Sequence, residues 1–416
     1  MRKIIVLFLI VILVLAGIFF IVKNPVSGKM NVKGIEYFKE GNFEKAEKAF
    51  LRSYNLNKKN IEPLINLIKC YIEQEKYAVA ETWLAKLMII APEHAETYGL
   101  QGLTGTVKQD YLKALEHLNL AIAADSTLAY LYFYRGIVNA NLGNLEEAAN
   151  DYLKARSFDE NNLKALEERA VILNKLNDFE GSIGNYNMML ELDPSNKDAF
   201  FNRGTFKMKI GDFEGAIADF DNTIKLDDQF AEAYFNKGKS HANLGQFDLA
   251  TECFRKSASF GFKETGALYN AGLASFKDNN LNEAKSYLLK SINKKEESEY
   301  LNNAYNILGV IEMMNGNQTA SLSYFDKSIS IDSTDADVFY NRGIAYGMLK
   351  EYAKALRDLN KCVALGRETP DVYFALGVNK ISLSNFSAGC KDLKKAALEG
   401  YEQARTMNAQ YCKDYQ

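Results

Sequence analysis

The sequence predicts an all-α solenoid of stacked helix pairs, preceded by one transmembrane helix. Two observations lead to this prediction: the chain repeats with a period of 34 residues from residue 27 onward, and a run of 19 apolar residues stands near its start. Proline, which costs roughly 3 kcal/mol inside a helix, occurs only five times in 416 residues. A chain with a fixed period and so few helix breakers is expected to grow by stacking helices.

The apolar run extends from Ile4 to Val22, after an N-terminal tail of residues 1–3. With a rise of about 1.5 Å per residue it covers roughly 28 Å, close to the ~30 Å hydrocarbon core of a bilayer. The alternative is a cleaved signal peptide, but its apolar region is usually about 7–15 residues long, so the run favours a retained signal anchor. Arg2 and Lys3 favour a cytoplasmic N-terminus, although Lys23 weakens that bias. We therefore expect a single-pass membrane protein whose repeats face the periplasm from a bacterial inner membrane.

Eleven repeats are expected between residues 27 and 403, with three extra residues after the eighth. Residues 404–416 are expected to form a C-terminal capping helix and tail, because they fall in register as a first helix without a partner. The predicted repeats are 27–60, 61–94, 95–128, 129–162, 163–196, 197–230, 231–264, 265–298, 302–335, 336–369 and 370–403.

Four positions of the repeat predict how the two helices of a pair pack. Position 8 is glycine in nine of eleven repeats, position 20 is small in all, position 24 is large in all, and position 17 is aromatic or leucine in ten. Glycine inside a helix costs about 1 kcal/mol relative to alanine, so its recurrence needs a packing reason. We expect position 8 of the first helix to face position 20 of the second, with the bulky residues on either side. The glycines are Gly34, Gly102, Gly136, Gly204, Gly238, Gly272, Gly309, Gly343 and Gly377.

This pattern resembles the tetratricopeptide repeat (TPR) family, and the resemblance covers residues 27 to about 403. It implies helix pairs stacked into a right-handed superhelix, with the first helix of each pair on the concave face. It also implies that a partner protein or an extended peptide binds in the concave groove.

Two columns of side chains are the candidates for partner binding. The resemblance places position 6 in the groove, where side-chain amides can hydrogen-bond the backbone of a peptide, and position 5 adds an aromatic column beside them. Asparagine at position 6 is frequent in the family whatever the ligand, so generic repeat residues are the alternative. The amides are Asn66, Asn202, Asn236, Asn270 and Asn341, and the aromatic residues are Phe133, Phe201, Phe235, Tyr269, Tyr340 and Phe374.

Arginine at position 7 favours ion pairs within a repeat over a clamp for a carboxylate ligand. Three arginines each precede an aspartate by sixteen residues, and Arg169 precedes Asn185 by the same interval. An exposed pair of this kind would contribute only about 0–1 kcal/mol. The expected pairs are Arg135–Asp151, Arg203–Asp219 and Arg342–Asp358.

The cysteines offer one candidate disulfide, between Cys390 in the last second-helix and Cys412 near the end of the capping helix. If the repeats are extracytoplasmic, this bond would contribute about 3 kcal/mol. Two unpaired thiols are the alternative. Cys70, Cys253 and Cys362 are expected to be ordinary buried residues.

The remaining composition argues against catalysis and nucleic-acid binding. The net charge is −3 and the pI is about 5.9, without the basic face that a nucleic-acid binder carries. No metal-ligand spacing, phosphate loop or hydrolase motif occurs, so we expect no enzyme activity, cofactor, metal or small-molecule substrate. The leading hypothesis is a membrane-anchored scaffold that binds a protein or peptide. Its alternatives are a structural spacer or assembly factor that acts through self-association or its convex face, and an organelle import receptor with cytosolic repeats. The oligomeric state is not predicted.

Overall fold

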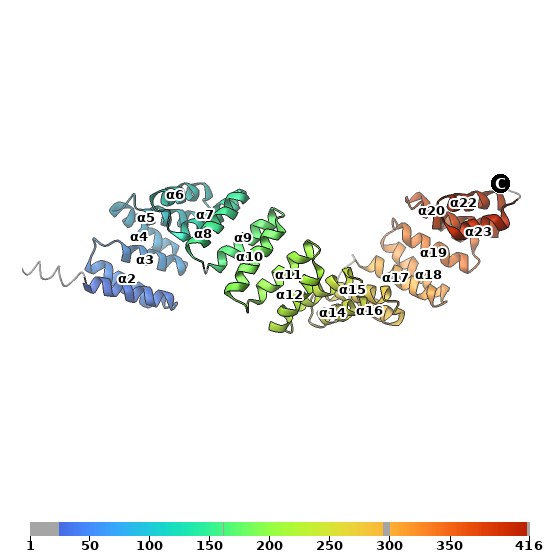
Figure 1. Ribbon diagram of the computed structural model, residues 1–416, viewed down its shortest axis with the longest axis horizontal. Helices are drawn as coiled ribbons and strands as arrows, with labels where there is room; N and C mark the ends of the chain where they lie inside the picture. The colour runs from blue at the N-terminus through green and yellow to red at the C-terminus, as the bar shows by residue number, and fades with distance from the viewer. Residues whose placement is uncertain (1–24, 161, 294–299, 414–416) are drawn as a thin grey trace, which may run out of the picture. The chain divides into compact units, whose positions relative to one another are not determined.

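The computed structural model describes residues 25–160, 162–293 and 300–413, and over these ranges it contains helices and turns but no strand (Figure 1). The all-α prediction is therefore confirmed for this part of the chain. The predicted transmembrane segment, residues 4–22, lies outside the described ranges. Within them, no helix combines the length and the apolar character needed to cross a membrane.

The helices fall into two compact units, residues 1–196 and 197–416. Unit 1 begins with a helix that includes residues 25–39. It continues with α2 (Phe43–Leu56), α3 (Glu62–Glu73), α4 (Tyr77–Ile90), α5 (Ala95–Val107), α6 (Tyr111–Ala124), α7 (Ala129–Leu142), α8 (Leu145–Phe158), α9 (Leu163–Lys175) and α10 (Phe179–Leu192).

Unit 2 has the same construction and ends in an unpaired helix. Its helices are α11 (Lys197–Lys209), α12 (Phe213–Leu226), α13 (Ala231–Asn243), α14 (Phe247–Ser259), α15 (Glu264–Lys277), α16 (Leu281–Asn293), α17 (Leu301–Met314), α18 (Gln318–Ile331), α19 (Ala336–Met348), α20 (Tyr352–Ala364), α21 (Pro370–Ser382), α22 (Phe386–Leu398) and α23 (Glu402–Tyr411).

The turn inside each pair is built from two adjacent residues. The first has a positive φ, as at Gly143 (85°) and Gly211 (84°), and ends the first helix in the left-handed conformation that glycine adopts without strain. The second of the two residues is polar and caps the start of the second helix. In α12 the carboxylate of Asp212 accepts a hydrogen bond from the backbone N–H of Gly215 at 2.9 Å. The chain therefore reverses within a few residues and lays the second helix against the first.

The glycines at position 8 make room for the large side chain at position 24. A Cβ added to Gly136 would meet the ring of Tyr152, and one added to Gly272 would meet Leu288 at 2.7 Å. Position 20 contributes its backbone, because the carbonyl oxygen of Ala284 would lie 3.2 Å from that same Cβ on Gly272. The close approach is as predicted, but position 24, rather than position 20, covers the glycine.

This packing predicts that Gly309→Ala destabilises unit 2. The new Cβ would lie 2.7 Å from Cδ1 of Phe325, whose side chain is fully buried. Overpacking of this kind costs typically about 1–3 kcal/mol. We expect a lower urea midpoint with an unchanged m-value when unfolding is followed by circular dichroism.

Gly184 in α10 is the matched control, because a Cβ there has no heavy atom within 4 Å. Gly184→Ala should leave stability unchanged or raise it by up to about 1 kcal/mol through helix propensity. Equal effects of the two substitutions would contradict the proposed packing.

The ion pairs predicted at an interval of sixteen residues are confirmed. Nη2 of Arg135 lies 2.7 Å from Oδ1 of Asp151, and Nε of Arg342 lies 2.7 Å from Oδ2 of Asp358. The Arg203–Asp219 pair is present at 2.6 Å, and Arg169 donates to Asn185 at 3.1 Å. The expectation that such pairs are exposed is wrong: the aspartate side chains are only 2–10% exposed. They lie between packed helices, where the loss of one partner costs more than at the surface.

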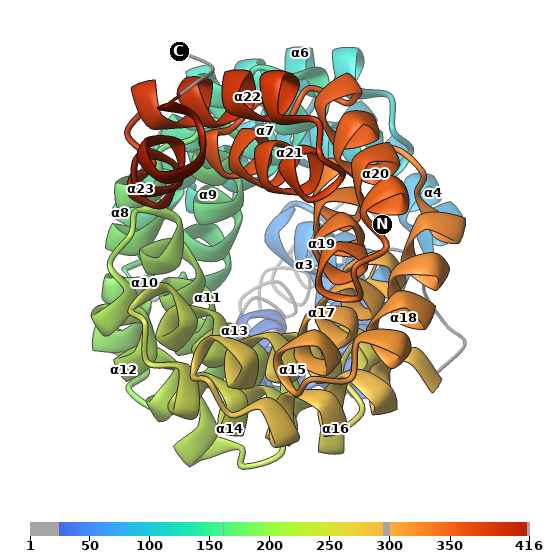
Figure 2. The same ribbon diagram turned by 90° about the vertical axis from the view of Figure 1, so that its right-hand side faces the viewer.

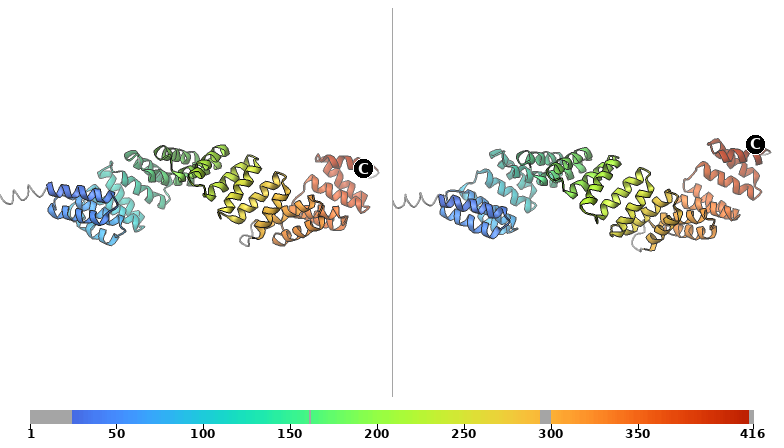
Figure 3. Two further views of the ribbon diagram at one scale, coloured as in Figure 1. Left: turned by 90° about the horizontal axis from the view of Figure 1, so that it is seen from below. Right: turned by 60° about the horizontal axis from the view of Figure 1, so that its bottom comes forward.

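Within unit 2 the two helices of each pair lie on different sides of the curved ribbon. Figure 2 shows α13, α15, α17, α19 and α21 on its inner side and α14, α16, α18, α20 and α22 on its outer side. The pairs follow one another in chain order in each unit (Figure 3). Corresponding positions of successive first helices therefore recur along one face of unit 2.

Candidate functional site

The amide column divides into residues that bond within the protein and residues that do not. Nδ2 of Asn66 donates to Oδ1 of Asn31 at 3.2 Å, and Nδ2 of Asn341 donates to Oδ1 of Asn306 at 2.9 Å. Nδ2 of Asn270 donates to the carbonyl oxygen of Gly266, one turn earlier in α15, at 2.8 Å. Each of these amides therefore has part of its hydrogen-bonding capacity occupied.

Asn202 in α11 and Asn236 in α13 are different. Both side chains are partly exposed, and neither forms a side-chain hydrogen bond with another described residue. They lie 34 residues apart at the same position of successive first helices. Two amides in this arrangement offer two donors and one acceptor each to a bound molecule.

The aromatic column mostly stabilises the packing of the helices. Phe133, Phe235 and Tyr269 are only 8–9% exposed, which leaves little of each ring for a partner. Phe201, Tyr340 and Phe374 are partly exposed. The column packs against position 24 or the turn after the second helix, with ring centroids 5.0–5.9 Å apart in the pairs Phe133–Tyr152, Phe201–Phe220, Phe201–Phe230, Phe235–Phe254, Phe235–Phe262, Tyr269–Tyr300 and Phe374–Tyr401.

A pocket of about 240 Å³ lies between α13 and α15 on the first-helix face. Its polar lining includes Asn270 and Asn243, and Lys239 and Lys277 add two positive charges. Leu273, Phe247 and Phe254 supply the apolar part of the lining. This lining suits an extended segment that carries an acidic side chain, because it presents amides and ammonium groups together.

Unit 1 has two pockets near the N-terminal ends of its first helices, and both include carboxylate groups in their linings. Asn66 lines a pocket of about 400 Å³ with Glu62 and Glu96, and Phe133 lines one of about 530 Å³ that also includes Glu96. Glu96 already accepts hydrogen bonds from Nζ of Lys69 at 2.9 Å and from the hydroxyl of Tyr130 at 2.5 Å. Part of this acidic character is therefore neutralised within the protein. Among the described residues, no cluster of histidine, cysteine and carboxylate side chains could hold a metal ion.

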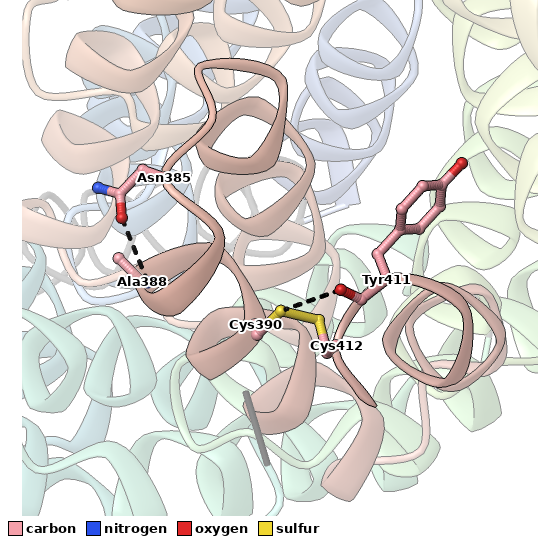
Figure 4. The surroundings of a disulfide bond; sticks show 5 residues. All are labelled: Asn385, Ala388, Cys390, Tyr411 and Cys412. Carbon is pink, nitrogen blue, oxygen red and sulfur yellow. Dashed lines mark hydrogen bonds between the residues drawn. A yellow bond between two sulfur atoms is a disulfide. The ribbon is translucent and has the colours of Figure 1, made fainter. Parts of the chain in front are cut away.

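Cys390 in α22 and Cys412, directly after α23, are joined by a disulfide (Figure 4). The S–S distance is 1.97 Å and the Cα atoms are 5.5 Å apart. Because α23 ends at Tyr411, Cys412 lies outside the helix and its sulfur reaches Cys390. Cys70, Cys253 and Cys362 are free and buried, and burial raises the pKa of the Cys253 and Cys362 thiols to about 11.

Family comparisons agree with this geometry. Three segments match family models described as tetratricopeptide repeat: residues 37–103, 231–260 and 324–357. The chain is a tetratricopeptide-repeat protein. No curated protein matches it significantly.

Solved structures that are similar to this TPR protein match it at low sequence identity. The C-terminal part of a TPR protein from Cytophaga hutchinsonii is 17% identical with a TM-score of 0.50, covering 58% of this chain and 97% of that one. PilF of Pseudomonas aeruginosa is 17% identical with a TM-score of 0.44, covering 52% of this chain and 98% of that one. Yeast Tom70 is 13% identical with a TM-score of 0.37, covering 94% of this chain and 96% of that one. At 17% identity, the similarity to the Cytophaga hutchinsonii structure concerns the fold alone.

Two residues of this TPR protein that the repeat pattern did not single out line a pocket with Tyr340 and Phe374. They are Gly347 in α19 and Asn379 in α21. Asn379 stands at position 10, where the other first helices of unit 2 carry Phe206, Ser240, Ala274, Ile311 and Ala345. The sequence signal that could have identified Asn379 is an amide at a position that is otherwise small or apolar.

Proposed function

We propose that this TPR protein is a non-enzymatic interaction scaffold that binds an extended segment of a partner protein along the first helices of unit 2. The observation that supports this most directly is the pair Asn202 and Asn236, whose amides lack partners among the described residues. A peptide backbone offers a donor and an acceptor at every residue, so recurring amides can hold it without reading its side chains. The pocket between α13 and α15 continues the same face.

The proposal also includes membrane anchoring through residues 4–22, a right-handed superhelix and an extracytoplasmic location of the repeats. The length of the apolar run supports the anchor. The Cys390–Cys412 disulfide supports the location, because disulfides persist in oxidising compartments. An import receptor with cytosolic repeats would keep these thiols reduced.

A spacer or assembly factor is the second candidate, and one observation favours it. On the second helices of unit 1, Ile89 is 84% exposed and Leu112 is 73% exposed. Apolar side chains this exposed on α4 and α6 would suit contact through the outer face.

We expect Asn202→Ala with Asn236→Ala to weaken partner binding about fivefold or more, because each lost amide bond contributes about 0.5–1.5 kcal/mol. A photocrosslinking residue at Lys239, which lines the pocket, would capture the partner in intact cells. The yield of the crosslinked species would be compared between the parent and the double variant.

The matched control is Asn222→Ala with Asn282→Ala, two exposed asparagines on the second helices α12 and α16. It should leave the yield unchanged. The second candidate would gain support if a crosslinker at Lys113, on the second helix α6 of unit 1, captured the same protein and if Asn202→Ala with Asn236→Ala left the yield unchanged.

A further inference from the structure

The pocket between α13 and α15 has two positive charges and no negative charge in its lining. Its charged residues are Lys239 and Lys277, and no aspartate or glutamate lines it. Both unit 1 pockets include Glu96, and the pocket between α19 and α21 includes Asp371. A lining whose only charges are positive distinguishes this pocket from those three and favours an anionic occupant.

Both lysines are available to a bound group. Lys239 and Lys277 are exposed, and neither forms an ion pair with another described residue. Nζ of Lys277 lies 5.5 Å from the centroid of the Phe247 ring, and this ring also lines the pocket. The ammonium group of Lys277 therefore lies at the pocket. An ammonium group has three donors and no acceptor, so the two lysines present only donors.

The two amides of the lining retain donors as well. Nδ2 of Asn243 donates to the carbonyl oxygen of Lys239 at 2.8 Å, and Nδ2 of Asn270 donates to that of Gly266 at 2.8 Å. Each Nδ2 carries a second hydrogen, which remains for a bound molecule. A carboxylate only accepts hydrogen bonds, so it matches a lining in which donors predominate.

The pocket lies beside the amide pair of the proposed function. Lys239 follows Asn236 by three residues on α13, an interval that places Cβ atoms about 5–6 Å apart. A segment whose backbone binds Asn236 would present a neighbouring side chain to the pocket, because an extended chain advances only about 3.3 Å per residue. Asn270 continues the amide column on α15, so the segment would pass the pocket rather than end in it.

We propose that the partner segment carries an aspartate or glutamate whose side-chain carboxylate binds in this pocket and accepts hydrogen bonds from the ammonium groups of Lys239 and Lys277. The apolar part of the lining, which includes Leu273 and Phe254, accommodates the methylene groups of that side chain. The inference rests on the proposed function and adds a charge requirement to it.

The test uses the full chain in a non-ionic detergent and the probe trifluoroacetyl-Ala-Leu-Glu-Leu-Ala-amide, with binding followed by ¹⁹F NMR line broadening. We expect saturable binding in the millimolar range at about 50 mM salt. A probe with glutamine in place of glutamate keeps the shape without the charge and should bind about fivefold more weakly. Raising the salt to about 500 mM should weaken the glutamate probe about threefold and barely change the glutamine probe, because salt screens exposed charges.

Lys239→Gln with Lys277→Gln tests the two lysines directly. Both positions are exposed and glutamine is nearly as good a helix former as lysine, so the variant is expected to fold. It should weaken the glutamate probe about fivefold and bring the two probes within about twofold of each other.

The matched control is Lys225→Gln with Lys290→Gln, two exposed lysines on the second helices α12 and α16. Nζ of Lys290 lies 5.5 Å from the ring centroid of Tyr287, as close as Lys277 lies to its aromatic neighbour. The control should leave the binding of both probes unchanged.

The inference is overturned if the glutamate probe does not bind, if it binds no more tightly than the glutamine probe, or if the lysine variant and its control weaken it equally. A third probe carries glutamine and a free C-terminal carboxylate, and it should bind more weakly than the glutamate probe. Tighter binding of this third probe would also overturn the inference, because the occupant would then be a chain terminus.

Asn202→Ala with Asn236→Ala separates this inference from the proposed function. It should weaken both probes by the same factor, because these amides bind the backbone and not the carboxylate. The crosslinking residue at Lys239 removes one of the two charges, but the parent and the double variant in that experiment both carry it, so their comparison is unaffected. Loss of partner capture in the double variant, without any preference for the glutamate probe, would leave the proposed function standing and remove only this inference.

Discussion

Asp219→Ala is expected to lower the free energy of unfolding of unit 2 by about 3–5 kcal/mol, the cost of removing one partner from a buried ion pair. The carboxylate of Asp219 is 2% exposed and accepts from Nη2 of Arg203 at 2.6 Å and from Nζ of Lys207 at 2.9 Å. The two cations are only 18% and 20% exposed. Removing the carboxylate leaves two positive charges close together in a poorly solvated place.

Urea unfolding of the full chain, followed by circular dichroism at 222 nm, measures this loss. Asp221→Ala is the matched control, because Asp221 lies on the same helix and pairs with Lys237 at 2.6 Å but is 54% exposed. We expect the control to lose no more than about 1 kcal/mol. If the two variants lost the same amount, burial would not be what makes the Asp219 pair important.

The contrast between these aspartates illustrates what the sequence could predict. An interval of sixteen residues connects facing positions of the two helices in a pair, so Arg203 and Asp219 could be paired by counting. Their burial depends on how closely the neighbouring helix pairs pack around them, which the interval does not contain. The sequence therefore predicted the partners correctly and their environment wrongly.

The glycine column shows the same limit. Recurrence of glycine at position 8 was sufficient to predict close helix packing, because helix propensity alone disfavours it. Whether the facing residue is at position 20 or at position 24 depends on the direction of side chains along the helix. The ring of Phe325 extends over Gly309, while Ser321 at position 20 is fully buried beside it.

The candidate site was less predictable than the fold. Position 6 identified which asparagines stand in the column but not which are occupied within the protein. In the two amide–amide pairs the acceptor is an asparagine 35 residues upstream, as Asn31 is for Asn66 and Asn306 is for Asn341. No asparagine stands at that interval before Asn202 or Asn236. An asparagine 35 residues upstream therefore distinguishes Asn66 and Asn341, whose amides are occupied within the protein, from Asn202 and Asn236. This interval can be read from the sequence once the geometry is known.

Loss of the Cys390–Cys412 bond is the second large effect, and it is expected to be local. The bond closes a loop with a sequence separation of 22, for which chain entropy predicts about 3 kcal/mol of stabilisation. Each helix pair of a solenoid contacts only its neighbours, and α23, the last helix that the structure describes, packs against α22. We therefore expect reduction to increase amide hydrogen exchange in α23 about a hundredfold, with smaller changes in α22.

The measurement is hydrogen exchange of the full chain before and after treatment with a phosphine reductant, which changes no side-chain volume. Cys390→Ala with Cys412→Ala should reproduce the result. Cys253→Ala, a buried free cysteine in α14, should leave exchange in α23 unchanged. Unchanged protection of α23 after complete reduction would mean that apolar contacts such as those of Ala404 and Met407 hold the capping helix without the bond.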